Sequence, residues 1–132
     1  YIDDDMLRIE VYKKIAVIDS VKSARAVKEE IIDRYGTMPR PVENLILIAL
    51  IKAYANAAGI LSVTRRGRTF TLKYGEGTAV EIEALLAVLS EYPGMAQLKA
   101  AEPPYIVFKA GKNAVDDLLR FLTDIRRCVK AQ

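Results

Sequence analysis

The residues with the greatest chemical potential lie in a basic segment near the middle of the chain. Its cations are Arg65, Arg66, Arg68 and Lys73. Phe70 and Tyr74 are interleaved with them, and no acidic residue occurs from residue 60 to residue 74. Cations beside aromatic rings can hold a phosphate backbone and stack on bases. The segment is therefore a candidate contact for nucleic acid or for an acidic protein surface. The alternative is a solvated turn whose aromatic rings face the core.

A second candidate cluster consists of Glu30, Asp33 and Arg34. On a helix, successive residues are about 100° apart, so these three side chains share one arc. That arc faces away from the apolar stripe that contains Ala24 and Ile31. A compact acid-acid-base cluster predicts a docking patch for a complementary protein surface. The alternative is a solvated helix face with an internal Glu30–Arg34 ion pair at i,i+4 spacing.

The chain lacks the residue types that most enzymes need. It contains no histidine and only one cysteine, Cys128, which excludes a cysteine-histidine pair and a zinc-cysteine cluster. The cations that flank Cys128 are expected to lower its pKa. Neighbouring carboxylates at 116–117 and at 81 and 83 diverge on a helix and do not converge on one ligand. We therefore expect no catalytic residue, no metal site and no cofactor in this chain.

Composition sets further bounds on the class of protein. The 132 residues are 52% hydrophobic, which is enough for a real core. The 20 basic and 17 acidic residues give a net charge of +3, too mild for a dedicated polyanion binder. A single cysteine suits the reducing cytoplasm. The apolar run at residues 45–51 is too short to cross a bilayer, so no membrane contact is expected.

The chain up to Gly59 has helical patterning. Acids at residues 3–5 favour a helix at 7–16, and Asp19 or Ser20 can cap a second helix that runs to Tyr35. A glycine at 36 and a proline at 41 mark the joint to a third helix, 41–58. That helix is apolar on most sides, so we expect it at the centre of the packing.

After Gly59 the pattern changes to short strands and helices. Residues 60–74 predict a hairpin with its turn at 66–68. Thr78 and Glu81 suggest a capping box that opens a helix to about residue 92. Strands at 96–99 and 105–109 predict a second hairpin, and Asn113 opens a last helix through 129. The expected fold is α+β, with a three-helix part at 1–59 and a hairpin-helix-hairpin-helix (ββαββα) part at 60–132.

Several segments together resemble a known family. They are Arg8-Ile-Glu-Val-Tyr-Lys-Lys-Ile15, Glu30-Ile-Ile-Asp-Arg-Tyr-Gly36, Met38-Pro39, Val42, Asn44-Leu45 and Ala58-Gly-Ile60. In this order and spacing, over residues 6–60, they resemble the C-terminal domain of bacterial transcription-repair coupling factor. Beyond residue 60 the similarity is looser and rests on the order of hairpins and helices.

The resemblance implies a larger parent protein. Such parents are ATP-driven translocases of double-stranded DNA that push RNA polymerase off lesions and recruit the excision-repair protein UvrA. ATP and magnesium belong to their motor, so the resemblance implies that this chain is not an enzyme. Because the sequence begins at Tyr1-Ile2-Asp3 without the family's usual lead-in, we expect it to be an excised fragment.

The resemblance also implies a regulatory role. In this family the C-terminal domain is thought to pack on the N-terminal UvrA-binding module and to mask it. The family's contact motif of glutamate, two residues, aspartate and arginine matches Glu30, Asp33 and Arg34. We therefore expect one autoinhibitory C-terminal domain, residues 1–132. The rival hypothesis is a nucleic-acid-binding module that uses the basic hairpin 65–73.

Overall fold

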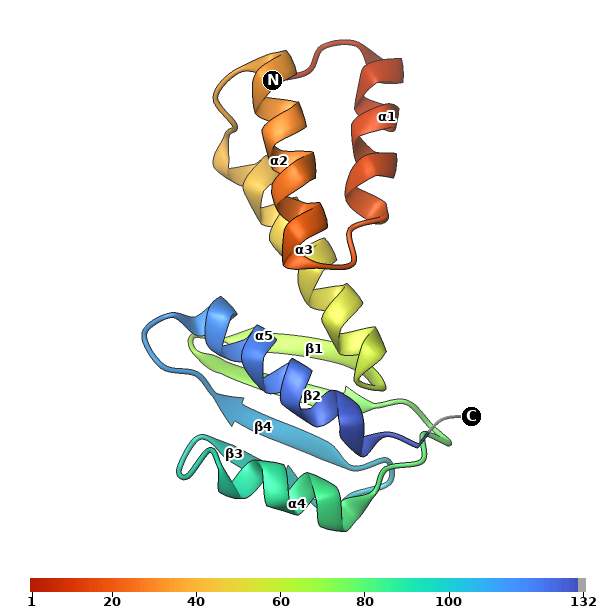
Figure 1. Cartoon of the computed structure of the whole chain (residues 1–132), viewed down its shortest axis with the longest axis vertical. Coiled ribbons are helices and arrows are strands. Elements are labelled where there is room, and N and C mark those ends of the chain that lie inside the picture. Colours follow the sequence, from red (N-terminus) through yellow and green to blue (C-terminus); the bar gives the residue numbers. More distant parts are fainter. Residues whose placement is uncertain (131–132) are drawn as a thin grey trace. The chain divides into compact units, whose positions relative to one another are not determined.

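The computed structural model describes residues 1–130 and divides the chain into two compact units, Tyr1–Ala53 and Tyr54–Gln132. The expected fold class is confirmed: three helices precede a ββαββα arrangement (Figure 1). The boundary between the units falls inside the third helix. No helix among the described residues is long and apolar enough to cross a membrane. In chain order the elements are α1 (Asp5–Ala16), α2 (Val21–Tyr35), α3 (Arg40–Ala57), β1 (Ile60–Arg66), β2 (Thr69–Tyr74), α4 (Ile82–Ser90), β3 (Ala96–Lys99), β4 (Tyr105–Lys109), α5 (Ala114–Ile125) and the 3₁₀ turn η1 (Arg126–Cys128).

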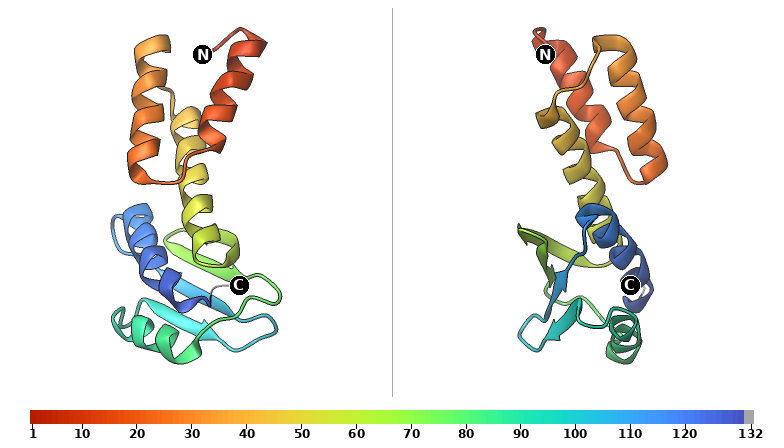
Figure 2. Two further views of the ribbon diagram at one scale, coloured as in Figure 1. Left: turned by 45° about the vertical axis from the view of Figure 1, so that its right-hand side comes forward. Right: turned by 90° about the vertical axis from the view of Figure 1, so that its left-hand side faces the viewer.

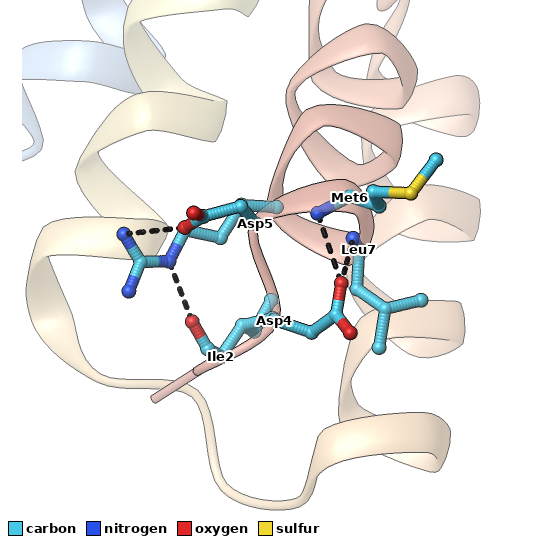
Figure 3. Close-up of polar contacts among 6 residues, drawn as sticks. Ile2, Asp4, Asp5, Met6 and Leu7 are labelled. Carbon is cyan, nitrogen blue, oxygen red and sulfur yellow. Dashed lines mark hydrogen bonds and ion pairs between the residues drawn. The ribbon is translucent and has the colours of Figure 1, made fainter.

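Helix α1 begins two residues earlier than the sequence pattern predicts, because Asp4 caps it. The Asp4 carboxylate accepts hydrogen bonds from the backbone N–H groups of Met6 and Leu7, at 2.9 and 3.1 Å (Figure 3). Free N–H groups at a helix start are stabilised by such an acceptor. The Arg8 side chain donates to the carbonyl oxygen of Ile2 at 2.6 Å, which fastens the segment that precedes the helix.

Helix α2 has well-defined signals at both ends. Ser20 is its N-cap, and Ser23 completes a reciprocal capping box: each side chain accepts a hydrogen bond from the other residue's backbone N–H. The helix ends at Gly36, whose φ of +87° is a conformation that favours glycine. Both ends agree with the sequence-based expectation. The caps fix the length of the helix that carries Glu30, Asp33 and Arg34.

The expectation that α3 lies at the centre of the packing is wrong for much of the helix. In the first unit, Ile46 and Leu50 are buried, but Leu45 and Leu47 are exposed and Ile48 is 52% exposed. The reason is geometric: an all-round apolar helix needs neighbours on every side, and the first unit supplies only two other helices. The first unit therefore retains exposed apolar surface.

The four strands form one antiparallel sheet in the order β1-β2-β4-β3. Side chains alternate between its two faces. Phe70, Leu72, Ile106 and Phe108 are buried on one face, and α4 and α5 both cover this face (Figure 2, right). The expected hairpins β1-β2 and β3-β4 are both present, and the pairing of β2 with β4 joins them into one sheet.

An aromatic cluster anchors the helices to the sheet. The rings of Phe108 on β4 and Phe121 on α5 stack with centroids 4.5 Å apart. Tyr92 meets both rings edge-on, at 6.0 and 5.0 Å. Its hydroxyl donates to the Asp124 carboxylate, and burial together with this hydrogen bond raises the pKa of Tyr92. Such ring pairs stabilise a core beyond their buried area.

The predicted capping box at Thr78 and Glu81 is wrong, and so is the predicted end of the last helix. The backbone before α4 pairs instead with the backbone after α5. The Glu81 N–H donates to the Cys128 carbonyl at 2.8 Å, and the Lys130 N–H donates to the Ala79 carbonyl at 2.9 Å. This pairing holds residues 79–81 extended, so α4 begins only at Ile82, and it stops the C-terminal helix before residue 129.

Replacing Phe121 by alanine should strongly destabilise the second unit. The side chain is fully buried and stacks on Phe108, so its removal leaves a cavity and should cost about 3–5 kcal/mol. Urea unfolding followed by circular dichroism measures this cost. The matched control is Leu86→Ala on α4, where the side chain is half exposed and the loss should be about 1 kcal/mol or less. Equal losses would contradict the assigned core.

Replacing Ser20 by alanine should destabilise α2 by about 1 kcal/mol, because the helix loses its capping acceptor. The same unfolding measurement on the first unit's transition checks this. Ser20→Asp is the control, since aspartate also accepts at an N-cap and should keep most of the stability. An alanine variant as stable as the parent chain would rule out the capping role.

Candidate functional site

The three residues of the predicted docking cluster lie on α2 in its last two turns, and all three are exposed. The buried residues of α2, Ala24 and Ile31, lie on a different side of the helix. The geometry therefore leaves the cluster accessible. We call Glu30, Asp33, Arg34 and their neighbour Lys14 the α2 patch.

Within the α2 patch, the charged groups make different contacts. Glu30 forms an ion pair with Lys14 of α1. The Arg34 guanidinium lies 5.8 Å from the centre of the Tyr35 ring. The expected Glu30–Arg34 pair is absent from the ion pairs found among residues 1–130, so that expectation is wrong. Lys14 competes for Glu30 because α1 packs beside α2, and a sequence without tertiary contacts gives no sign of this.

Asp33 differs from Glu30, the other carboxylate of the patch. In the described part of the chain, its carboxylate takes part in no side-chain hydrogen bond and no ion pair. An exposed carboxylate without an internal partner can pair with a cation of an external one. Of the two carboxylates of the α2 patch, Asp33 is thus the better placed to gain an ion pair on docking.

An open groove of about 700 Å³ lies between α2 and α3, and Glu30, Asp33 and Arg34 are not among the residues that line it. Ile32 and Glu29 of α2 line it, together with Leu47 and Leu50 of α3. Protein interfaces commonly combine an apolar centre with a charged rim. The sequence contained a signal for this groove, since α3 is apolar on more sides than a three-helix unit can cover.

The basic hairpin is exposed, but its aromatic rings are not. Its four cations, Arg65, Arg66, Arg68 and Lys73, all lie on the surface. Phe70 and Tyr74 are each only 1% exposed, because strand alternation turns both toward the helices. Base stacking on these two rings is therefore excluded, and the alternative that they face the core is confirmed.

One cation of the hairpin is engaged within the chain. The Arg65 guanidinium lies 5.2 Å from the centre of the Phe70 ring, and its Nε donates to the Gly67 carbonyl at 2.7 Å. Gly67 has a φ of +63° at the first position of the two-residue turn, which is typical of a type II′ turn. Arg65 therefore closes the turn and covers the edge of the core.

The remaining candidate groups, the Cys128 thiol and the paired carboxylates, are placed for structural rather than catalytic roles. Cys128 is fully buried, and burial raises the pKa of its thiol despite the opposing charge of Arg127, so the expected lowering is wrong. The Asp117 carboxylate accepts a hydrogen bond from the Gly111 N–H at 2.7 Å. Across residues 1–130, no group of three His, Cys, Asp or Glu side chains is placed to hold a metal ion.

Comparison with known proteins places the chain in a family. The model of the TRCF domain matches residues 1–85. This region contains α1 to α3 and the hairpin β1-β2, and it includes the α2 patch.

Curated relatives carry the same name throughout. The transcription-repair-coupling factor of Mycobacterium tuberculosis is 38% identical over 64 residues, which are 48% of this chain and 5% of the relative. That of Buchnera aphidicola is 31% identical over 93 residues, 70% of this chain and 12% of the relative. That of Bacillus subtilis is 28% identical over 83 residues, 63% of this chain and 7% of the relative. The chain thus spans only a small part of the length of these relatives.

A solved structure extends the similarity to nearly the whole chain. It is a crystal structure of the C-terminal domain of transcription-repair coupling factor, with a TM-score of 0.76 and 27% sequence identity. The match covers 97% of this chain and 84% of that structure, so it includes the second unit, which the family model largely omits. The chain therefore belongs to the TRCF domain family, and its fold is that of the C-terminal domain of transcription-repair coupling factor.

Proposed function

We propose that this chain is the regulatory, autoinhibitory domain of an ATP-dependent DNA translocase that couples transcription to nucleotide-excision repair. The α2 patch docks on the N-terminal UvrA-binding module of the same protein and masks it. When the motor engages, this contact opens and UvrA gains access. The observation that carries the proposal is the exposure of Glu30, Asp33 and Arg34 on one face of α2, in a chain whose residues 1–85 match the TRCF domain.

The charge pattern of the α2 patch supports a specific rather than a general contact. The patch carries two carboxylates and two cations within a small area. A partner must present charges in the complementary order, so the pattern discriminates against wrong surfaces more than it adds affinity. Of the two carboxylates, Asp33 contributes more to such recognition, because Lys14 already pairs with Glu30.

The groove between α2 and α3 supports a contact with an apolar centre. Exposed side chains such as Ile32, Leu47 and Ile48 remain on the first unit after it folds. Apolar surface of this extent is typical of regions that another protein covers. A partner that extends from the α2 patch over this groove would bury part of this surface and gain hydrophobic free energy.

A modest contact is sufficient for this mechanism because both partners belong to one polypeptide. Tethering gives the docking module an effective concentration of the order of millimolar. A patch with weak intrinsic affinity then stays mostly closed, and a competing interaction of the motor can still open it. Binding of RNA polymerase, double-stranded DNA, ATP and Mg²⁺ belongs, in this proposal, to other parts of the parent protein.

Reversing three of the four charges of the α2 patch should release the UvrA-binding module. The variant is Glu30→Arg, Asp33→Arg and Arg34→Glu in the full-length parent. Each substitution puts like charges opposite one another in the docked state, so UvrA affinity should rise at least about 10-fold. Surface plasmon resonance with immobilised UvrA measures the change.

The matched control reverses three exposed charges of the second unit: Glu76→Arg, Glu83→Arg and Arg120→Glu. It alters the net charge by the same amount and should leave UvrA affinity unchanged. Circular dichroism of both variants of the isolated chain should show the parent spectrum, since all six side chains are exposed. A triple α2 variant that binds UvrA no better than the parent would disprove the docking assignment.

Single substitutions should rank the members of the α2 patch. Asp33→Asn removes a carboxylate without an internal partner, whereas Glu30→Gln removes one that Lys14 already neutralises. In the same binding assay, Asp33→Asn should raise UvrA affinity more than Glu30→Gln does. The reverse order would mean that the docked partner replaces Lys14 at Glu30 and makes little use of Asp33.

A further inference from the structure

The sheet of the second unit has one face that neither α4 nor α5 covers (Figure 2, right). Within each strand, the residues on this open face alternate with the buried ones. Thr71 and Lys73 of β2 point there, as do Tyr105 and Lys109 of β4. We call the outward residues of the four strands the open face.

The open face is basic and free of acids. All four strands together contain no aspartate or glutamate. The acids of the second unit lie in its helices and turns, for example Glu83 on α4 and Asp116 on α5. The cations of the open face are Arg66, Lys73, Lys99 and Lys109, one on each strand, and all are exposed. An ordinary solvated face mixes both signs of charge, and this one does not.

Protection of the sheet edges explains only two of these four cations. Lysines often lie on edge strands, where they oppose pairing with another chain. Arg66 on β1 and Lys99 on β3 fit this role, because β1 and β3 are the edges of the sheet. Lys73 and Lys109 lie on β2 and β4, the two inner strands. Their charges point from the middle of the sheet toward solvent, where they can meet an anionic partner.

One row of the open face places an aromatic ring between two lysines. In the sheet register, Tyr105 on β4 is directly opposite Lys73 on β2 and directly opposite Lys99 on β3. Side chains opposite one another in neighbouring antiparallel strands lie about 4.5–5.5 Å apart at their Cβ atoms. Tyr105 is partly exposed, in contrast to the buried Phe70 and Tyr74. Its phenol can therefore take a stacked group while the lysines hold flanking charges.

We propose that the open face binds a single strand of nucleic acid. The flanking lysines neutralise successive phosphates, Tyr105 stacks on a base, and the hydroxyl groups of Thr64 and Thr71 in the next row accept or donate hydrogen bonds. An acidic peptide would satisfy the cations but carries no aromatic base for the ring to stack on. A duplex hides its bases, and a flat sheet face does not enter a groove. This surface is separate from the α2 patch and does not depend on the proposed function.

The test measures binding of the 132-residue chain to labelled oligonucleotides of about 12 nucleotides, oligo-dT and oligo-rU, by fluorescence anisotropy at about 50 mM salt. Both oligonucleotides offer phosphates and bases, and the one that binds more tightly identifies DNA or RNA as the preferred ligand. Binding should weaken as salt rises. The variant Lys73→Gln with Lys99→Gln should make the slope of log affinity against log salt shallower by about 1.4, because two phosphate contacts are lost.

The stacking role has its own variant. Tyr105→Leu keeps an apolar side chain on the strand but removes the ring, and it should weaken binding about 10-fold. Tyr105→Phe should bind like the parent chain. The matched control is Lys112→Gln with Arg120→Gln, two exposed cations outside the strands, which should change neither affinity nor slope. The α2 charge reversal should also leave oligonucleotide binding intact, which separates this inference from the docking proposal.

Three results would overturn the inference. One is the absence of any anisotropy change at low salt. Another is an equal loss in the control pair and in the lysine pair of the open face, which would indicate a response to net charge alone. The third combines two observations: a poly-glutamate peptide of matching charge competes as well as unlabelled oligonucleotide, and Tyr105→Leu binds the oligonucleotide like the parent chain. That result would assign the face to an acidic protein partner instead.

Discussion

The alternation of side chains along four short strands is the constraint on which the second unit depends. Because β2 and β4 pair in register, Phe70 aligns with Phe108 and Leu72 with Ile106, and all four enter the core under α4 and α5. The same register sends Lys73 and Tyr105 outward as a pair. A shift of one residue would exchange the two sets and bury the charges. The free energy of burying the aromatic residues thus also determines which chemical groups reach the surface.

The first unit obeys a different constraint, since three helices cannot enclose an apolar helix on all sides. Capping at Asp4 and Ser20 sets where α1 and α2 begin, and the ion pair of Lys14 with Glu30 joins them. Helix α3 buries only part of its apolar surface. The resulting groove lies between α2 and α3, and the α2 patch lies on another side of α2, toward α1. This combination is consistent with a domain that acts by covering another surface.

Local signals in the sequence predicted most elements, and contacts between residues far apart in the chain account for most of the errors. Prolines, glycines and strand alternation located the hairpins, and the strands at 96–99 and 105–109 have the predicted bounds. The false capping box at Thr78 arose because residues 79–81 pair with a segment about 50 residues away, which no local pattern reveals. The sequence also identified the exposed α2 residues but not Lys14. The open face was not predicted, because the outward residues of β3 and β4 come close to Lys73 only through the pairing of β2 with β4. The alternation of buried and outward residues along β4 did indicate that Tyr105 and Lys109 point to the same face.

The burial of Cys128 gives the second unit an internal probe. This residue is the only cysteine of the chain, and its carbonyl accepts the hydrogen bond that joins the segment before α4 to the segment after α5. A thiol reagent reaches the sulfur only when that junction separates. Its labelling rate therefore reports the frequency of local opening under native conditions. A cysteine introduced on the surface would react far sooner, so a fluorophore can be attached at one chosen position without removing the native residue.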